Sequence, residues 1–288
     1  LTATDNCGTA AVTFAESIAQ GSCPGAYTIT RTWTATDACN NVTTHVQTIT
    51  VQDTTAPTFV EALPTDSTVQ CDAVPTAATL TATDNCGTAA VTFAESITQG
   101  TCPGAYTITR TWTATDACNN VTAHIQTITV QDTTVPVITT QASSIVVECD
   151  GSGNQGAVQA WLASNGGAVA TDNCSDVTWS NDFDALSNDC SAAITVIFTA
   201  TDACGNTASS SATFTVQDIT APITPEAPAA LTLACASEVP AAVSLTATDN
   251  CAGEITTSGV DTIAAGQCPN SFVITRTWTF TDACNNSS

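Results

Sequence analysis

The sequence predicts an all-β protein made of small, disulfide-stapled repeats in tandem. Two cysteine motifs recur with a period of about 80 residues, as expected of an array in which each repeat is one folding unit. Within the segments between the cysteines, apolar and polar residues alternate with period two, and turn residues separate these segments. The motifs are Asp-Asn-Cys at Cys7, Cys86, Cys174 and Cys251, and Asp-Ala-Cys at Cys39, Cys118, Cys204 and Cys284.

The 15 cysteines follow one order along the chain, and we number them first to fourth within each repeat. The two motifs carry the second and fourth cysteines. First cysteines are Cys71, Cys149 and Cys235, and third cysteines are Cys23, Cys102, Cys190 and Cys268. The repeats are predicted at residues 1–55 (partial, without its N-terminal strand), 56–134, 135–220 (with a short helical insertion) and 221–288 (partial, without its last strand). We therefore expect a segment of a longer protein.

The strand pattern is clearest at residues 106–114, where one face carries only threonine. The other face carries Tyr106, Ile108, Arg110, Trp112 and Ala114, which is typical of a half-buried antiparallel strand. Short strands with frequent turns predict immunoglobulin-like β-sandwiches in a rod-like array. Residues 156–164, followed by Asn165-Gly-Gly, predict a short helix in the third repeat that caps its sandwich.

Evenly spaced cysteines without a Cys-x-x-Cys pair predict disulfides and an extracellular location. In an immunoglobulin-like sandwich the second and fourth cysteines lie at one pole, and the first and third at the other. This topology favours pairing within each repeat, although four cysteines allow two other connectivities. The predicted bonds are Cys7–Cys39, Cys71–Cys102, Cys86–Cys118, Cys149–Cys190, Cys174–Cys204, Cys235–Cys268 and Cys251–Cys284, with the partner of Cys23 outside the chain.

The charge balance excludes two classes of partner. The chain has 26 acidic residues against three arginines, and its formal net charge is −23. Such a surface repels phosphate backbones and anionic lipid headgroups, so we expect no nucleic-acid binding and no direct membrane insertion in this segment.

Arginine and an acidic residue are kept or lost together in the repeats. Each arginine lies eight residues before a fourth cysteine, and each acid lies seven before a third cysteine. This covariation predicts the structural ion pairs Arg31–Glu16, Arg110–Glu95 and Arg276–Asp261, with Trp33, Trp112 and Trp278 beside them. The third repeat has Val196 and Phe183 at these positions. A glycan-binding Arg/Trp pair is the alternative reading.

The motifs resemble a known family. Asp-Thr-Thr-Ala-Pro at residues 53–57, followed by strands leading to Thr-Ala-Thr-Asp-Ala-Cys and Asn or Gly, resembles the hyalin-repeat (HYR) module. The chain is most similar to the four-cysteine variant in long surface proteins of gliding bacteria, including SprB-type adhesins exported by type IX secretion. The resemblance implies an extracellular adhesion or stalk role at the cell surface, without catalysis.

No motif for catalysis occurs, and the histidines His45 and His124 occupy the same position in two near-identical repeats. Acidic residues at the predicted joints between repeats favour a calcium site instead, because Ca²⁺ prefers several hard oxygen ligands. We expect each joint acid to meet two turn acids of the next repeat. The three predicted groups are Asp53 with Asp84 and Asp116, Asp132 with Asp172 and Asp202, and Asp218 with Asp249 and Asp282.

Modification is a further hypothesis, because Asp-Ser/Thr before a small or aliphatic residue suits bacterial O-glycosylation. The candidate positions are Thr54, Ser67, Thr133 and Thr262. We interpret the chain as a stalk segment that binds neighbouring repeats of the same longer chain and projects a region for an unidentified surface or glycan. The alternatives are a packing unit of an extracellular filament or sheath, and an accessory stalk of a surface enzyme.

Overall fold

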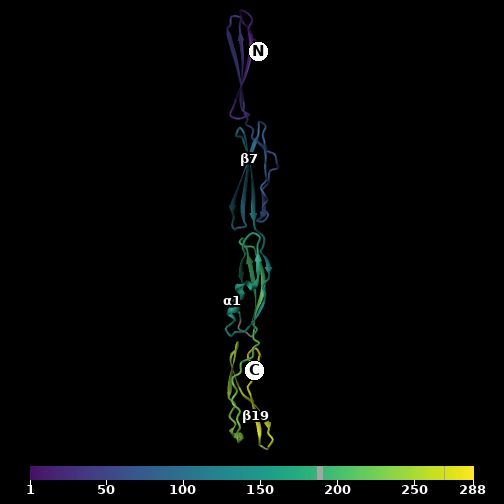
Figure 1. Cartoon of the computed structure of the whole chain (residues 1–288), viewed down its shortest axis with the longest axis vertical. Coiled ribbons are helices and arrows are strands. Elements are labelled where there is room, and N and C mark those ends of the chain that lie inside the picture. The colour runs from purple at the N-terminus through teal and green to yellow at the C-terminus, as the bar shows by residue number, and fades with distance from the viewer. Residues whose placement is uncertain (187–190, 269) are drawn as a thin grey trace. The chain divides into compact units, whose positions relative to one another are not determined.

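The computed structural model describes residues 1–186, 191–268 and 270–288, in two compact units, Leu1–Thr133 and Thr134–Ser288. Each unit holds two of the predicted repeats. Nearly all regular structure is β-strand, and the predicted all-β fold of disulfide-linked, immunoglobulin-like sandwich repeats is confirmed (Figure 1). Within the described ranges, no helix combines the length and the hydropathy needed to span a bilayer.

The first repeat is a single antiparallel sheet. Its strands β1 (Ala11–Gln20), β2 (Tyr27–Thr36) and β3 (Val42–Val51) pair in chain order. Both faces of β2 remain half-exposed along its whole length, because this repeat has little chain to cover the sheet. The isolated bridge between Thr4 and Thr9 closes the turn around Cys7.

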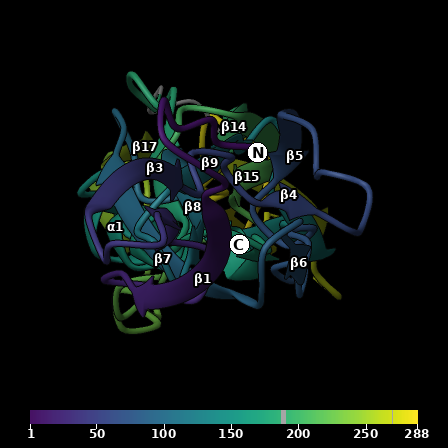
Figure 2. The same ribbon diagram turned by 90° about the horizontal axis from the view of Figure 1, so that it is seen from above.

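The second repeat adds the missing layer. Strands β5 (Ser67–Gln70), β9 (Val121–Gln131), β8 (Tyr106–Asp116) and β7 (Ala89–Gln99) form one sheet in that order, with β5 parallel to β9. Strands β4 (Thr58–Phe59) and β6 (Ala82–Thr83) pair separately and lie on one side of this sheet (Figure 2). The second layer is therefore small, and much of the cover is irregular chain.

The core of the second repeat follows the alternation of β8. Its even-numbered residues from Ile108 to Asp116 are buried, while its threonines stay half-exposed. Ile108 packs with Ile128 and Val130 of β9, and Trp112 is 1% exposed. The predicted two-faced strand is confirmed at these residues.

The third repeat builds its core around a helix. Strands β11 (Ile145–Glu148), β15 (Thr207–Gln217), β14 (Ala193–Thr201) and β13 (Thr178–Asn181) form its main sheet, and β10 (Val137–Thr140) pairs with β12 (Val169–Thr171). Helix α1 (Gln155–Ala163) and the turn η1 (Asn165–Gly167) confirm the predicted insertion. Trp161 of α1 lies 5.1 Å from Phe198 between ring centroids, so the helix supplies core as well as cover.

The fourth repeat consists of two hairpins. Strand β16 (Ser244–Asp249) pairs with β17 (Gly253–Ser258), and β18 (Val260–Ala265) pairs with β19 (Phe272–Thr277). The short turn η2 (Ala236–Glu238) follows Cys235. Among the described residues of this repeat, the buried apolar ones are Phe280, which is 2% exposed, and Ala247.

Candidate metal centre and disulfides between repeats

A disulfide joins the first and second repeats. Cys23 lies in the turn between β1 and β2, and Cys118 lies in the turn between β8 and β9, 95 residues further along the chain. Their Cα atoms are 5.2 Å apart, within the range that a disulfide requires. The bond connects the third cysteine of one repeat to the fourth cysteine of the next.

The turn that carries Cys23 packs closely on the second repeat. A Cβ atom added to Gly25 would lie 2.7 Å from Cβ of Asp53 and 2.9 Å from Cβ of Cys86. Real Cβ atoms do not approach so closely, so glycine is required for this contact. The Cys-Pro-Gly turn thus brings Cys23 to its partner.

A second disulfide joins the third and fourth repeats in the same manner. Cys149, a first cysteine, bonds to Cys251, a second cysteine, with 5.4 Å between the Cα atoms. The amide of Asn250 donates a 2.7 Å hydrogen bond to the carbonyl of Cys149. Gly151 has a φ of 69°, and a Cβ there would lie 2.6 Å from the carbonyl oxygen of Asn250. Both observed bonds therefore connect consecutive repeats.

These bonds correct the predicted pairing within repeats. The wrong bonds are Cys86–Cys118, Cys149–Cys190 and Cys251–Cys284, and also Cys7–Cys39 and Cys235–Cys268, whose four cysteines are free. The predicted absence of a partner for Cys23 within the chain is wrong too. Cys190 itself lies outside the described residues. The physical reason is that Cys23 lies against Cys118 of the second repeat and Cys149 lies against Cys251 of the fourth, so these two bonds form between repeats.

Five described cysteines are free, and all five are exposed: Cys7, Cys39, Cys86, Cys235 and Cys268. The other described cysteines are disulfide-bonded, and they include Cys71, Cys102, Cys174, Cys204 and Cys284. The predicted pairs Cys71–Cys102 and Cys174–Cys204 stay predictions.

A group of buried acids lies where the fourth repeat follows the third. Asp218 comes directly after β15, and Asp282 lies in the Asp-Ala-Cys turn after β19; each is 6% exposed. Ligand-capable atoms of Asp218, Asp282 and Cys284 lie within 4.8 Å of one another. Because Cys284 is disulfide-bonded, the carboxylates are the ligands that this group offers.

Hydrogen bonds hold these acids in place, but some of their carboxylate oxygens have no hydrogen-bond partner. Asp282 accepts bonds from the backbone N–H groups of Cys284 (2.7 Å) and Asn286 (2.9 Å), and the Asn286 amide also donates to the carbonyl of Asp218 (3.0 Å). Asp249 accepts bonds from Cys251 and Ala252 through its Oδ1. The Oδ2 atoms of Asp218 and Asp249 are buried and have no hydrogen-bond partner. Buried acceptors without a donor are costly, and carboxylate oxygens in this position suit a divalent cation.

Electrostatics at this group also favour a cation. Burial raises the pKa of Asp218, and the negative charges of Asp249, Asp282 and Glu148 raise it further. Burial acts in the same direction on the pKa of Asp282, but hydrogen bonds from Asn286 and Cys284 outweigh it and lower that pKa. A divalent ion would offset the repulsion among these carboxylates.

Sequence reasoning missed Glu148 at this site. Its Oε1 accepts hydrogen bonds from the Ile219 N–H (3.0 Å) and the Thr220 hydroxyl (2.8 Å). These bonds lower the pKa of Glu148, and the bond from Ile219 has the largest effect. Glu148 directly precedes the first cysteine of the third repeat. The equivalent residue of the second repeat is Gln70, which bonds to Thr133. The replacement of this glutamine by an acid at position 148 was the feature of the sequence that could have indicated the role of Glu148.

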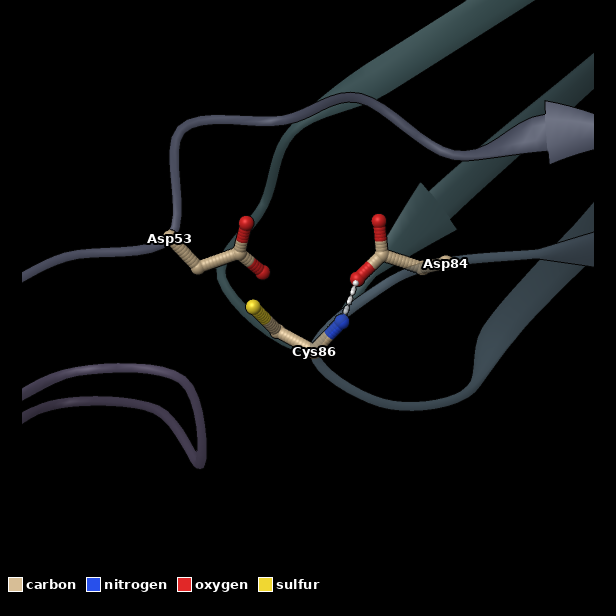
Figure 3. Close-up of side chains that lie close together, drawn as sticks. All are labelled: Asp53, Asp84 and Cys86. Carbon is tan, nitrogen blue, oxygen red and sulfur yellow. Dashed lines mark hydrogen bonds between the residues drawn. The ribbon is translucent and has the colours of Figure 1, made fainter.

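A similar group lies where the second repeat follows the first. Asp53, Asp84 and the free thiol of Cys86 present atoms within 4.8 Å of one another (Figure 3). Asp84 accepts a 2.9 Å bond from the Cys86 N–H through Oδ1, while its Oδ2 is buried without a partner. Burial and the charges of Asp53 and Asp84 raise the pKa of the Cys86 thiol.

The remaining predicted ligands are also placed by turns. Asp116 accepts bonds from the Cys118 and Asn120 N–H groups, and the Asn120 amide reaches the carbonyl of Asp53 at 3.2 Å. Asp202 holds its own turn in the same way, with bonds from Cys204 and Asn206. The predicted group of Asp132, Asp172 and Asp202 takes residues from both compact units, and it stays a prediction.

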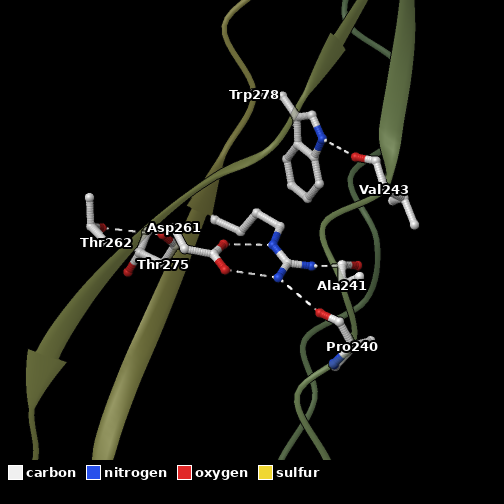
Figure 4. Close-up of polar contacts among 8 residues, drawn as sticks. Pro240, Ala241, Val243, Asp261, Thr262, Thr275 and Trp278 are labelled. Carbon is white, nitrogen blue, oxygen red and sulfur yellow. Dashed lines mark hydrogen bonds and ion pairs between the residues drawn. The ribbon is translucent and has the colours of Figure 1, made fainter.

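The arginine–acid pairs form in all three repeats that carry them. Nε of the arginine lies 2.7 Å from Glu16 at Arg31, 2.7 Å from Glu95 at Arg110 and 2.6 Å from Asp261 at Arg276. Arg276 also donates to the carbonyls of Pro240 and Ala241, and Trp278 donates to Val243 (Figure 4). The hydrogen bond from Arg276 lowers the pKa of Asp261. These contacts tie irregular chain to the sheet, which is a structural role.

The third repeat explains why both partners are lost together. Val196 is fully buried against α1, with Trp161, Phe198 and Phe214 in the same cluster, and Phe183 packs beside it. An arginine at position 196 would place its charge among these apolar groups. The helix thus replaces the ion pair.

The predicted glycosylation positions differ in accessibility. Thr54, Thr133 and Thr262 are exposed. The hydroxyl oxygen of Ser67 is buried, so it does not suit attachment of a sugar. Glycosylation of the other three stays a prediction.

Comparison with known proteins gives one family match. Residues 59–130 and 223–288 match the model of the HYR-like domain with 4 cysteines, which supports assignment of these segments as HYR-like modules. No curated protein matches the chain.

Cadherin ectodomains are among the solved structures with some likeness to the chain. Mouse clustered PcdhgC3 EC1-3 is 12% identical, with a TM-score of 0.30, and the match covers 68% of this chain and 77% of that one. Drosophila N-cadherin EC1-4 is 12% identical at a TM-score of 0.25, covering 100% and 84%. The protocadherin GammaB4 extracellular domain is 14% identical at a TM-score of 0.30, covering 90% and 53%, so the chain spans about half of its length. At these TM-scores the likeness carries no argument.

Proposed function

We propose that the chain is a stalk segment of a secreted, SprB-type cell-surface adhesin, exported by type IX secretion, whose repeats act as a load-bearing spacer for a binding region. The carrying observation is the Cys23–Cys118 disulfide, which joins consecutive repeats. A spacer under tension needs joints that do not open, and a covalent bond across a joint meets that need. The proposal assigns no catalysis to this segment.

The chemistry of the bonds supports an extracellular setting. Disulfides persist in oxidising compartments and are rare in the cytosol. The acidic surface, with a net charge of −23, suits solubility outside the cell and leaves few basic sites for trypsin-like proteases. The partners of such a spacer are neighbouring repeats, while an extracellular surface or glycan would bind elsewhere.

Single-molecule stretching of the full chain from its two termini tests this function. While the disulfide is intact, the 95-residue separation between Cys23 and Cys118 is protected from extension. Its release adds at most roughly 300 Å at roughly 3.3–3.6 Å per residue, because Cys71 and Cys102 inside this loop are also bonded. We expect this extra length only after reduction, or in Cys23→Ser. The matched control is Cys39→Ser, which removes a free thiol and should change nothing. Equal lengths before and after reduction would contradict a load-bearing joint.

We also propose that the acids between repeats bind Ca²⁺, with Asp218, Asp249 and Asp282 as ligands and Glu148 contributing charge. The two buried, unpartnered Oδ2 atoms carry this step. Titration calorimetry should detect calcium binding to the full chain, and Asp218→Asn should weaken it more than tenfold. Asp184→Asn, at an exposed acid outside the group, is the control. Absence of heat, with an unchanged thermal midpoint, would exclude the site.

One observation favours a second candidate, the packing unit of a filament. Phe93 and Ile97 on edge strand β7 are 48% and 54% exposed, although they lie on the same face as Trp112. This uncovered apolar strip could make lateral contacts. Sedimentation at micromolar concentration tests this candidate. Oligomers that dissociate in the Phe93→Thr variant but persist in the Val121→Thr variant would support the filament. A monomeric wild-type chain would exclude it.

A further inference from the structure

The two observed disulfides define a pattern of cysteine classes. Cys23–Cys118 joins a third cysteine to the fourth cysteine of the next repeat. Cys149–Cys251 joins a first cysteine to the second cysteine of the next repeat. In both bonds the earlier repeat contributes a first or third cysteine, and the later repeat contributes a second or fourth cysteine. We call first and third cysteines donors, and second and fourth cysteines acceptors.

This pattern accounts for which described cysteines are free. The acceptors Cys7, Cys39 and Cys86 need a first or third cysteine that the 288 residues do not hold in the preceding repeat. The donors Cys235 and Cys268 need a second or fourth cysteine of a following repeat. The nine other described cysteines, all of them bonded, have a matching class in a neighbouring repeat. Pairing within repeats cannot explain this division, because it would leave Cys7 bonded to Cys39.

We propose that the five exposed thiols are the unfilled halves of this pattern, and that each takes its partner from a further repeat of the same type. Cys235 takes a second cysteine and Cys268 a fourth cysteine. Cys7 and Cys86 take first cysteines, and Cys39 takes a third cysteine. The exposed turns that carry these thiols are therefore attachment points for another repeat.

The covalent step balances with a small-molecule disulfide as oxidant. One protein thiolate attacks oxidised glutathione and releases one reduced glutathione. The thiolate of the partner repeat then displaces the second glutathione and forms the bond between repeats. The two protein sulfurs are oxidised, and the two glutathione thiols carry away the protons.

The sequence offers an in-phase test. Ser288 and Thr43 both follow a fourth cysteine by the same number of residues, so residues 44–134 can be repeated directly after Ser288. The full chain and this extended chain are oxidised in a glutathione buffer, alkylated and mapped by mass spectrometry. In the full chain we expect label on the five free cysteines. In the extended chain Cys235 and Cys268 should lose their label and cross-link to the appended copies of Cys86 and Cys118.

Matched variants make the test specific to class. Cys118→Ser in the appended copy should restore label at Cys268 alone, and Cys86→Ser in that copy should restore it at Cys235 alone. Label retained at both residues of the extended chain, a bond between Cys235 and Cys268, or bonds to the appended first and third cysteines would overturn the proposal. This readout is independent of mechanical strength, so it can fail while the stalk function stands.

Discussion

Cys23 is bonded to Cys118, although the chain around Cys118 repeats, with few changes, the chain around Cys39. Two cysteines in nearly identical turns thus differ in their bonding, because Cys118 forms a disulfide and Cys39 is free. The difference arises from the neighbour: Cys118 has a preceding repeat that presents a third cysteine. Bond formation in this protein depends on the joint between repeats.

The first prediction concerns the stability of the Leu1–Thr133 unit. Cys118→Ser removes a bond that closes a long loop, so the free energy of unfolding should fall by about 2–4 kcal/mol. Urea denaturation of the full chain, followed by hydrogen exchange in β8 and β9, measures this loss. Cys39→Ser provides the control in an equivalent turn and should leave exchange unchanged. Equal protection in both variants would show that the bond does not stabilise the unit.

The sequence predicted which pole of a sandwich each cysteine occupies, but not its partner. Second and fourth cysteines share a pole, and that placement is compatible with a bond inside the repeat or across the joint. Near-identical repeats present the same residues in both cases, so local pattern cannot choose. The choice depends on close approach of the turns, which Gly25 and Gly151 permit. Those glycines were visible in the sequence, but their contacts were not.

The second prediction compares two arginines in nearly identical strands. The Arg110 side chain is 5% exposed and donates to the Pro75 carbonyl at 2.8 Å, whereas the Arg31 side chain is 37% exposed. Arg110→Gln should cost about 2–3 kcal/mol, because it removes a buried guanidinium that bonds to both Glu95 and the Pro75 carbonyl. Arg31→Gln should cost less than about 1 kcal/mol, since solvent screens that pair. Hydrogen exchange of β8 and β2 checks this; equal effects would contradict the assigned burial.

Covariation of arginine and acid in the sequence indicated these pairs before the structure showed their geometry. It could not indicate the difference in burial, because Arg110 and Trp112 bond to the carbonyls of Pro75 and Ala78, in irregular chain that lies against β8. It also could not indicate that α1 fills the corresponding space in the third repeat.

The third prediction concerns that helix. Trp161 lies 5.1 Å from Phe198 and 5.5 Å from Phe214, and its indole N–H donates to the Ser143 carbonyl at 2.9 Å. Trp161→Ala should destabilise the third repeat by about 3–5 kcal/mol through the cavity it leaves. Gln159→Ala, on the exposed side of the same helix, should change stability by less than about 0.5 kcal/mol. Near-ultraviolet circular dichroism during urea unfolding measures both; similar midpoints would mean that the helix is only a surface cap.

The fourth prediction uses the raised pKa of Asp218. Burial and nearby acids favour the protonated carboxyl in the folded state, so the ionised form destabilises it. The free energy of unfolding should therefore fall as the pH rises from the ordinary carboxyl range through the raised pKa. Asp218→Asn lacks this group. Without calcium it should be more stable than the wild type at about pH 7 and equally stable at about pH 3, below both pKa values.

Added calcium should reverse that order at neutral pH, because only the wild type offers the Asp218 carboxylate. Thermal midpoints with and without EGTA measure the reversal, and Asp184→Asn should follow the wild type throughout. A wild type that is always the more stable form in EGTA would contradict the electrostatic argument. The sequence indicated the three acids through their recurrence at turns, but the unpartnered oxygens and Glu148 needed the fold.

Peptide mapping under non-reducing conditions tests the central relationship most directly. Residues 1–57 and 80–136 differ only at positions 19, 22, 44, 46 and 56 of the first segment. Cleavage at acidic residues therefore gives Cys23 and Cys102 peptides of different mass, and likewise for Cys39 and Cys118. The structure predicts cross-linked peptides containing Cys23 with Cys118 and Cys149 with Cys251. Recovery of Cys86 with Cys118 and Cys251 with Cys284 would contradict bonds between repeats and return each repeat to a self-contained module.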